Sequence, residues 1–210
     1  MIISLTGKIG SGKDTVADLI NQITPYHNWE VKKFAGKLKV IAELLTGVPK
    51  ANFEDQEFKK QYIGDDWGMT YRDLLQKLGT EAIRTGLHSD AWVNALFSDY
   101  KANTVAVGTS EFDFTEEDQI PNWIITDCRF PNELEAVKKR GGVTIKIERD
   151  LMTRKGYSTP TEADLHSSET SLDHITSWDY VIDNNSSAEE LKFKVKDILE
   201  NLKLLQYAGL

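Results

Sequence analysis

Short apolar runs alternate along the chain with longer stretches in which apolar residues recur at helical spacing. The short runs predict buried strands, and we place them at residues 2–6, 30–34, 122–126, 143–148 and 180–182. The longer stretches predict amphipathic helices, at residues 13–23, 38–47, 132–140 and 188–205, with further helical turns across 52–101. Strands separated by helices are typical of a parallel sheet covered on both faces. The pattern therefore predicts a three-layer α/β/α fold with a mostly parallel sheet.

Two stretches depart from this pattern. Residues 107–119 are acidic and lack a regular period, which predicts a solvated loop. Residues 151–168 are polar and contain Gly156 and Pro160, which predicts a lid-like flap over about 150–170. We expect one domain over residues 1–210, with a helical insertion over 35–104.

The composition excludes several classes of protein. Hydrophobic residues make up 40% and charged residues 28% of the chain, as in ordinary globular domains. A single cysteine excludes an internal disulfide framework and suits a reducing cytoplasm. The net charge of −8 argues against a nucleic-acid polymer as partner, although a small site can still gather cations around a compact anion. Residues 1–5 are too short an apolar run for a signal peptide or membrane span, so we expect a cytoplasmic protein without a membrane partner.

The strongest functional signal is a glycine-rich segment between the first predicted strand and the first predicted helix. Residues 7–15 read GKIGSGKDT. Glycines let the chain curl so that successive N–H groups face one anion, and the helix N-terminus adds partial positive charge. A lysine at the end of such a loop reaches the outer phosphates of a nucleotide. The candidate nucleotide-binding residues are Gly10, Ser11, Gly12, Lys13, Asp14 and Thr15.

One position in this segment is unusual. Phosphate-binding loops place Ser or Thr after the lysine to hold Mg²⁺, whereas this chain has Asp14. A carboxylate can hold the ion directly or through water, and the Thr15 hydroxyl could contact a phosphate nearer the nucleoside. Asp14 is therefore the candidate metal ligand. The alternative is a glycine-rich turn that binds no ligand.

A second polar group follows the strand predicted at 122–126. Ligand crevices in parallel sheets lie at the carboxyl ends of the strands, where Asp127 and Arg129 stand. A carboxylate there can orient Mg²⁺-bound water or the loop lysine, and an arginine can clamp a phosphate. Glu133, four residues on, could orient Arg129. The alternative is a structural ion pair between Asp127 and Arg129, and Cys128 is interpreted as a buried residue.

Polar residues with helical spacing in 71–85 predict a substrate-binding face. They are Arg72, Gln76, Gly79, Thr80 and Arg84. A glycine inside a helix costs about 1 kcal/mol relative to alanine, so we expect a planar base to approach the backbone there. Gln76 could pair with base edges, and Trp92 could stack on the base or wall the pocket. The alternative is a solvated helix face with a core tryptophan.

The predicted flap carries three cations. Arg149, Arg154 and Lys155 could reach the transferring phosphoryl group when such a segment closes. Surface solvation is the alternative for each of them.

Taken in order, these motifs resemble the bacteriophage-type deoxynucleoside monophosphate kinases, relatives of the nucleoside monophosphate kinases. The resemblance covers most of the chain and rests on further segments besides the glycine-rich loop. These read FAGKLK at 34–39, RDLLQ at 72–76, GT at 79–80, DAWV at 90–93, DCRFPNE at 127–133, HSSE at 166–169 and VIDN at 181–184. Relatives can carry a basic residue at position 73, where this chain has Asp73.

The resemblance implies a P-loop kinase fold with a helical acceptor-binding insertion and a small flap. It also implies transfer of the γ-phosphoryl group of ATP to a deoxynucleoside monophosphate, with Mg²⁺. ATP and the metal would lie at Ser11, Lys13, Asp14 and Thr15. The acceptor side would be formed by Arg72, Gln76, Gly79, Thr80 and Trp92, with Asp127, Arg129 and Glu133 between the two. The catalytic groups would be Lys13, Arg129, Asp127 and Arg72.

Two other functions are consistent with the sequence. A small-metabolite kinase, such as one acting on dephospho-coenzyme A, shares the phosphate loop and the chain length. A nucleotide-dependent switch would bind ATP or GTP without a second substrate. The expected partners are thus small nucleotides (ATP and a dNMP), and the sequence is compatible with a homodimer.

Overall fold

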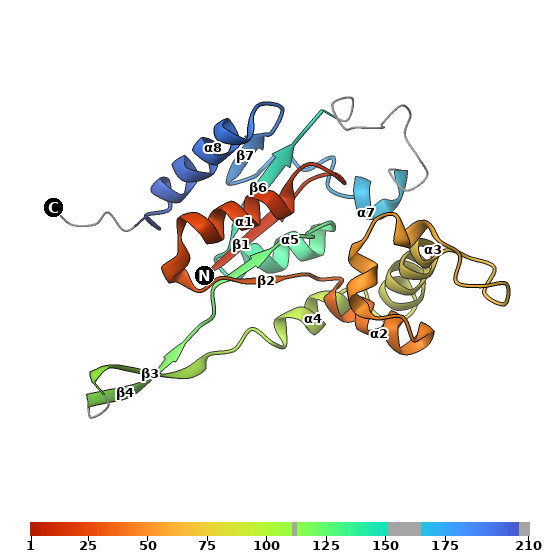
Figure 1. Cartoon of the computed structure of the whole chain (residues 1–210), viewed down its shortest axis with the longest axis horizontal. Helices are drawn as coiled ribbons and strands as arrows, with labels where there is room; N and C mark the ends of the chain where they lie inside the picture. Colours follow the sequence, from red (N-terminus) through yellow and green to blue (C-terminus); the bar gives the residue numbers. More distant parts are fainter. Residues whose placement is uncertain (111–112, 151–164, 206–210) are drawn as a thin grey trace. The chain divides into compact units, whose positions relative to one another are not determined.

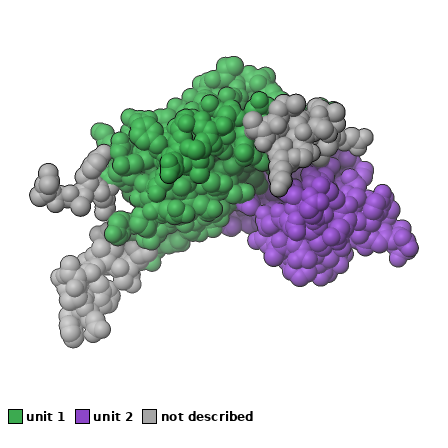
Figure 2. All heavy atoms as spheres, turned by 45° about the horizontal axis from the view of Figure 1, so that its top comes forward, with its two compact units in different colours: residues 1–32, 100–210 green, residues 33–99 purple. Residues whose placement is uncertain are grey.

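The computed structural model describes residues 1–110, 113–150 and 165–205 (Figure 1). The chain divides into two compact units (Figure 2). The first comprises residues 1–32 and 100–210, and the second comprises residues 33–99. The sequence predicts an insertion over 35–104. The second unit begins two residues earlier, at residue 33, and ends five residues earlier, at residue 99.

A parallel sheet forms the centre of the first unit. Among the described residues its strands are β1 (Ile2–Thr6), β2 (Glu30–Lys32), β5 (Trp123–Ile125), β6 (Val143–Glu148) and β7 (Tyr180–Asp183). They lie in the order β2-β5-β1-β6-β7, and every neighbouring pair is parallel. The sheet confirms the α/β fold class, and each strand lies within a residue or two of its predicted range.

Helices cover both faces of this sheet. Ile3 and Leu5 of β1 belong to one buried cluster with residues of α1 (Lys13–Ile23) and α8 (Ala188–Asn201), and these two helices lie side by side in Figure 1. Alternation along β1 turns Ile2 to the opposite face. There α5 (Pro131–Lys138) packs, with Val137 close to Ile2. The chain thus leaves β1 toward one face and β5 toward the other.

The second unit is helical and has its own core. Its elements are α2 (Gly36–Thr46), the 3₁₀ turns η2 (Lys50–Glu54) and η3 (Phe58–Lys60), α3 (Tyr71–Gln76), the π-helix η4 (Lys77–Thr85) and α4 (Ala91–Phe97). Ala42, Phe53, Tyr71 and Leu74 form a buried cluster within it. The helical turns predicted across 52–101 are present, and the helix predicted over 71–85 changes to π geometry at Lys77.

Two details of the sequence prediction are wrong. The stretch 107–119, predicted as a loop, belongs to an antiparallel hairpin of β3 (Asn103–Ser110) and β4 (Asp113–Gln119). Backbone pairing makes these strands, so an acidic composition does not exclude them. In addition, α5 begins at Pro131 with Phe130 as its N-cap, rather than at Asn132, because proline is favoured at the first helical position. The predicted flap lies largely in 151–164, outside the described residues.

Candidate active site

The site lies where the connections that follow β1 and β5 meet. These strands are neighbours in the sheet, and their connections lead to helices on opposite faces. In open parallel sheets such a switch point opens a crevice at the carboxyl ends of the strands. Thr6 Oγ1 at the end of β1 donates to the Cys128 carbonyl after β5 at 3.3 Å and joins the two connections. The two motifs selected from the sequence are therefore brought together within one unit.

Glycines at two positions determine the shape of the loop after β1. Gly12 caps α1 with a φ of 100°, in the left-handed region that side chains disfavour. A Cβ on Gly12 would also lie 2.5 Å from Asn184 Nδ2, which donates to the Ser11 carbonyl at 2.8 Å. A Cβ on Gly7 would lie 2.4 Å from the Ile147 carbonyl oxygen. The loop is thus packed against the ends of β6 and β7.

The side chains of the loop fit a phosphate-bearing ligand. Lys13 Nζ folds back and donates to the carbonyls of Gly7 and Lys8 at 2.7 and 2.8 Å. Ser11 Oγ is buried and finds no hydrogen-bond partner among the described residues. A buried hydroxyl without a partner is costly, and a ligand or water is the usual compensation. An ammonium group bound to neutral carbonyls and an unsatisfied hydroxyl are both suited to an anion bound at the loop.

Asp14 and Thr15 occupy the first turn of α1, where both are exposed. Carboxylate oxygen is a ligand that Mg²⁺ prefers, and this ion is commonly held by one or two carboxylates together with substrate phosphates and water. The described residues contain no cluster of three or more His, Cys, Asp or Glu side chains able to hold a metal on their own. The chemistry of Asp14 fits a magnesium ion that is shared with a nucleotide.

Arg129 is held from two sides. Its backbone N–H and that of Phe130 donate to Glu133 Oε2, at 2.8 and 3.1 Å. Glu133 is 2% exposed, and its carboxylate caps the start of α5 by accepting the N–H of the N-cap residue Phe130. The Arg129 guanidinium forms an ion pair with Glu169 of α7 (Ser167–Thr170). Glu133 therefore fixes the backbone of Arg129, which agrees with the expectation that it orients this residue. Contact of Glu133 with a substrate stays a prediction.

The neighbours of Arg129 differ in exposure. Asp127 is half-buried in the segment that follows β5. Cys128 is buried, and burial together with the nearby Glu133 carboxylate raises the pKa of its thiol far above the ordinary range. A thiol held neutral is a poor nucleophile. The structure confirms the interpretation of Cys128 as a packing residue.

A pocket of about 330 Å³ opens beside the loop within the first unit. Its walls come from the loop after β1, the segment after β5, the end of β6 and α7. The charged side chains that line it are Lys8, Arg129, Lys146, Glu148, Arg149, Glu169 and Asp173. Arg149 Nη1 also approaches the Gly10 carbonyl at 3.5 Å. Arg154 and Lys155, the other cations predicted in the flap, lie outside the described residues.

The predicted acceptor face belongs to the second unit. Arg72 Nη2 donates to Gln56 Oε1 at 3.1 Å, and Gln76 and Thr80 are half-buried. Trp92 is buried, and its Nε1 donates to the Gly79 carbonyl at 2.8 Å. A Cβ on Gly79 would lie 2.8 Å from a methyl group of Leu38. Packing within the unit thus accounts for the glycine, and contact of these residues with a base stays a prediction.

Asp73 has a local structural role. Its carboxylate accepts the backbone N–H and the hydroxyl of Thr70, at 2.9 and 2.7 Å, and the Thr70 hydroxyl accepts the Asp73 N–H. These hydrogen bonds lower the pKa of the Asp73 carboxyl. Asp73 therefore completes a capping box that starts α3.

Comparison with known proteins identifies the family. The sequence pattern of the family described as "Deoxynucleotide monophosphate kinase" matches residues 46–195 of this chain. The chain belongs to the deoxynucleotide monophosphate kinase family. Membership confirms the resemblance found in the sequence and the expectation of a kinase. The match includes the acceptor-face motifs, the segment after β5 and α7.

Family members of viral origin are similar over much of the chain. A putative deoxynucleotide monophosphate kinase of Acanthamoeba polyphaga mimivirus is 29% identical and covers 96% of this chain and 97% of its own length. The enzyme of Escherichia phage RB69 is 30% identical over 65% of this chain, and that of Enterobacteria phage T4 is 31% identical over 67%. These matches span about half of each phage protein, 47% and 48%.

Among solved structures, shikimate kinase from Aquifex aeolicus aligns over the whole of both chains, with 15% identity and a TM-score of 0.45. Within the described part of the kinase chain, no helix has the length and hydropathy needed to cross a bilayer.

Sequence reasoning missed three residues of this site. Glu169 and Asn184 contact the phosphate loop, and Lys8 of the loop contacts the backbone of Glu169. Glu169 and Asn184 lie in segments that carry the family resemblance, which was the available signal. Their partners in the phosphate loop lie 160 or more residues away in the chain, so no local pattern reveals the contacts.

Proposed function

We propose that the protein transfers the γ-phosphoryl group of ATP to a deoxynucleoside monophosphate, giving the diphosphate and ADP. The observation that supports this most is the meeting of the Lys13 loop and Arg129 at the switch point of the sheet, in a chain of the deoxynucleotide monophosphate kinase family. A phosphate loop beside a second cation provides for two anions to be bound close together.

On the donor side, the backbone N–H groups of Gly10, Ser11 and Gly12 would bind the phosphates of ATP, with Thr15 nearer the nucleoside. Lys13 would exchange the carbonyls of Gly7 and Lys8 for phosphate oxygens, which are stronger acceptors because they are charged. Asp14 would hold Mg²⁺, which when bound neutralises charge on the phosphates. Asp127 would orient metal-bound water or Lys13.

The transfer itself requires charge stabilisation rather than a general base. An acceptor phosphate, with a second pKa near 6, is largely a dianion at pH 7 and is already nucleophilic. Lys13 and Arg129 would stabilise charge on the phosphoryl group as it moves, while the loop N–H groups hold the donor in line. Glu133 contributes by fixing the backbone of Arg129.

On the acceptor side, we propose that unit 33–99 binds the monophosphate through Arg72, Gln76, Gly79, Thr80 and Trp92. The supporting feature is the π-helix η4, which contains Gly79 and Thr80. Such helices are rare in proteins, and those that occur are often found at functional sites. Of the cations predicted in the flap, Arg149 lines the pocket beside the loop and would add positive charge near the phosphates.

The experiment that tests this function measures ADP formation from ATP and Mg²⁺ with a panel of acceptors. The panel contains the four dNMPs, the four ribonucleotides and dephospho-coenzyme A. We expect ADP formation to depend on one or more dNMPs. Activity restricted to dephospho-coenzyme A, or slow hydrolysis that no acceptor stimulates, would overturn the proposal.

A further inference from the structure

The mechanism described above assigns no role to Glu169, although this carboxylate lies beside the site. The Glu169 side chain is only 4% exposed. A buried carboxylate is costly unless charges and hydrogen bonds compensate it. The groups that compensate the Glu169 carboxylate therefore indicate its role.

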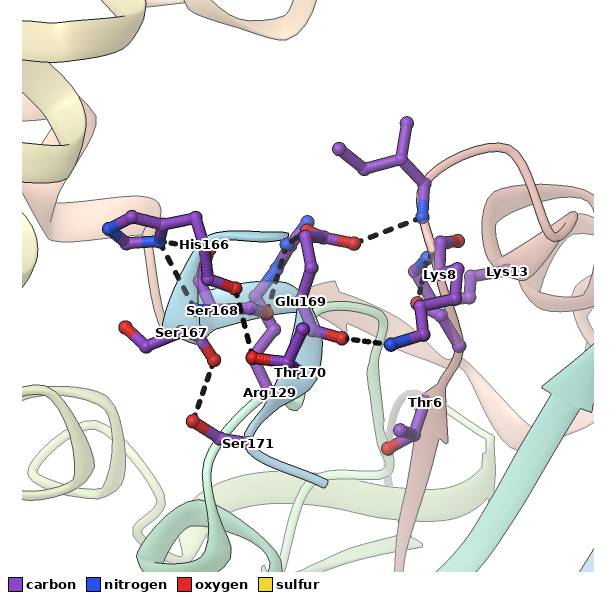
Figure 3. Close-up of polar contacts among 12 residues, drawn as sticks. Thr6, Lys8, Lys13, Arg129, His166, Ser167, Ser168, Glu169, Thr170 and Ser171 are labelled. Atoms are coloured by element: carbon purple, nitrogen blue, oxygen red, sulfur yellow. Dashed lines mark hydrogen bonds and ion pairs between the residues drawn. The ribbon is translucent and has the colours of Figure 1, made fainter. Parts of the chain in front are cut away.

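Both carboxylate oxygens of Glu169 contact the candidate active site. Oε2 accepts the backbone N–H of Ile9 in the phosphate loop at 3.1 Å, and Oε1 forms the ion pair with Arg129 (Figure 3). One side chain thus joins the loop after β1 to the cation after β5. Its two partners are groups of the kind that bind phosphate.

The backbone around Glu169 strengthens this connection. Lys8 Nζ donates to the Glu169 carbonyl at 2.5 Å and pairs with the Asp173 carboxylate. Arg129 Nη1 also approaches the Ser168 carbonyl at 3.3 Å. Segment 168–173 therefore contacts both connections at the switch point through main-chain and side-chain groups.

Local hydrogen bonds fix the position of Glu169 in α7. The Ser168 N–H donates to His166 Nδ1 at 3.2 Å, and the Glu169 N–H donates to the His166 carbonyl at 2.8 Å. The Ser171 hydroxyl donates to the Ser167 carbonyl at 2.6 Å. The HSSE segment thus forms a small rigid turn that presents Glu169.

We propose that Glu169 is a positioning residue for phosphoryl transfer, which sets the Arg129 guanidinium relative to the Ile9 amide of the phosphate loop. This role rests on the proposed function. An arginine side chain has many rotamers, and a charge that stabilises a transition state is most effective when its position is fixed before the reaction. Glu169 supplies that restraint through its contacts with Ile9 and Arg129.

The positioning role predicts a particular kinetic signature. Glu169→Gln keeps the size of the side chain and removes its charge, so Arg129 loses its charged partner. We expect kcat to fall at least tenfold, with the KM values for ATP and dNMP within about twofold of wild type. Glu135→Gln is the matched control, since Glu135 is an exposed glutamate paired with Lys139 on α5, and we expect it to leave kcat unchanged.

A double-mutant cycle tests whether Glu169 acts through Arg129. We expect Arg129→Ala with Glu169→Gln to have the kcat of Arg129→Ala alone, because the residue to be positioned is already absent. Losses that multiply in the double variant would overturn the proposal, as would a Glu169→Gln enzyme with wild-type kcat. A Glu169→Gln protein that melts below the assay temperature, or binds no ADP by calorimetry, would also overturn it, because the residue would then maintain the fold.

The same cycle distinguishes this proposal from the proposed function. A wild-type protein that phosphorylates no dNMP in the acceptor panel would refute the function. The cycle is then measured on ATP hydrolysis without acceptor, where the same coupling between Glu169 and Arg129 is expected. Coupling between Glu169 and Arg129 in a protein without dNMP kinase activity would support the positioning role and rule out a dNMP as the substrate.

Discussion

At the scale of single residues, the Lys13 side chain of the phosphate loop is hydrogen-bonded to neutral acceptors. The Lys13 ammonium group is bound by the carbonyls of Gly7 and Lys8 within its own loop. Phosphate oxygens carry charge and make shorter, stronger hydrogen bonds than carbonyls. Lys13 can therefore exchange these carbonyls for the phosphate oxygens of a nucleotide with little change elsewhere in the loop.

We expect Lys13→Ala to lower kcat by a factor of about 10²–10³, or ~3–4 kcal/mol of transition-state stabilisation, as for the loss of other charge-stabilising donors. The melting temperature should stay close to that of wild type, because the Gly7 and Lys8 carbonyls that Lys13 binds belong to its own loop. Steady-state kinetics with ATP and a dNMP, together with a thermal melt, measure both. Lys192→Ala, an exposed lysine of α8, is the control. Wild-type turnover in Lys13→Ala would remove Lys13 from the mechanism.

A second cluster of charges stabilises the other unit. Glu54 accepts hydrogen bonds from Lys39 at 2.5 Å and Lys33 at 2.9 Å, and Lys39 is buried. Burial acts to raise the pKa of Glu54, but the hydrogen bonds and charges of the two lysines outweigh it and lower the pKa to about 2. The ionised form of Glu54 is therefore the one that the fold prefers.

This cluster predicts a pH dependence of stability. Because the folded pKa lies below the ordinary value of 4.5, the stabilisation is complete above about pH 5 and is lost as the pH falls toward 2. Glu54→Gln should lower the free energy of unfolding at pH 7 and have less effect at pH 3. Urea titrations at the two pH values measure this difference. Equal effects at both values would contradict the lowered pKa.

At the scale of elements, close packing between the phosphate loop and β6 restricts what can stand at position 7. The nearest obstacle to a Cβ on Gly7 is the Ile147 carbonyl, which belongs to the sheet backbone and cannot rotate away. By contrast, a Cβ on Gly36 at the start of α2 would meet nothing within 4 Å. The two glycines therefore form a matched pair for testing this contact.

We expect Gly7→Ala to lower the free energy of unfolding by about 1–3 kcal/mol, in the range for overpacked sites, and to weaken ATP binding. Gly36→Ala should be neutral or stabilising by up to about 1 kcal/mol, since alanine favours helix. Urea unfolding and ATP calorimetry on both variants measure these effects. A Gly7→Ala protein as stable as Gly36→Ala would show that the loop can move away from β6.

At the scale of the whole molecule, binding to the loop should stabilise the folded chain. A ligand that binds only the native state at a concentration of 100 Kd adds about 2.7 kcal/mol. For a chain of this length each kcal/mol raises Tm by roughly 2–4 °C.

We therefore expect saturating ADP to raise Tm by about 5–10 °C in a thermal melt and to raise it much less in Lys13→Ala. A loop that binds no nucleotide would show no shift in either protein. The comparison separates binding at the loop from a general effect of the nucleotide on the protein.

The sequence by itself determined the parallel α/β architecture, the phosphate loop and the family. These follow from local patterns, namely apolar periodicity, the glycines of residues 7–12 and the order of short motifs. Each strand, helix and motif in these patterns is expressed within about 15 consecutive residues, so it is detected without knowing what it contacts in the fold. The same holds for α1, whose predicted and observed bounds are identical.

Only the tertiary structure decided which side chains meet. Glu169 reaches Ile9 and Arg129 from distant parts of the chain, and Glu133 accepts the backbone N–H of Arg129. The hairpin over 103–119 and the π-helix over 77–85 likewise depend on backbone pairing that composition does not encode. A hydrogen bond or ion pair requires two groups at one place, and folding alone brings together groups that the sequence keeps apart.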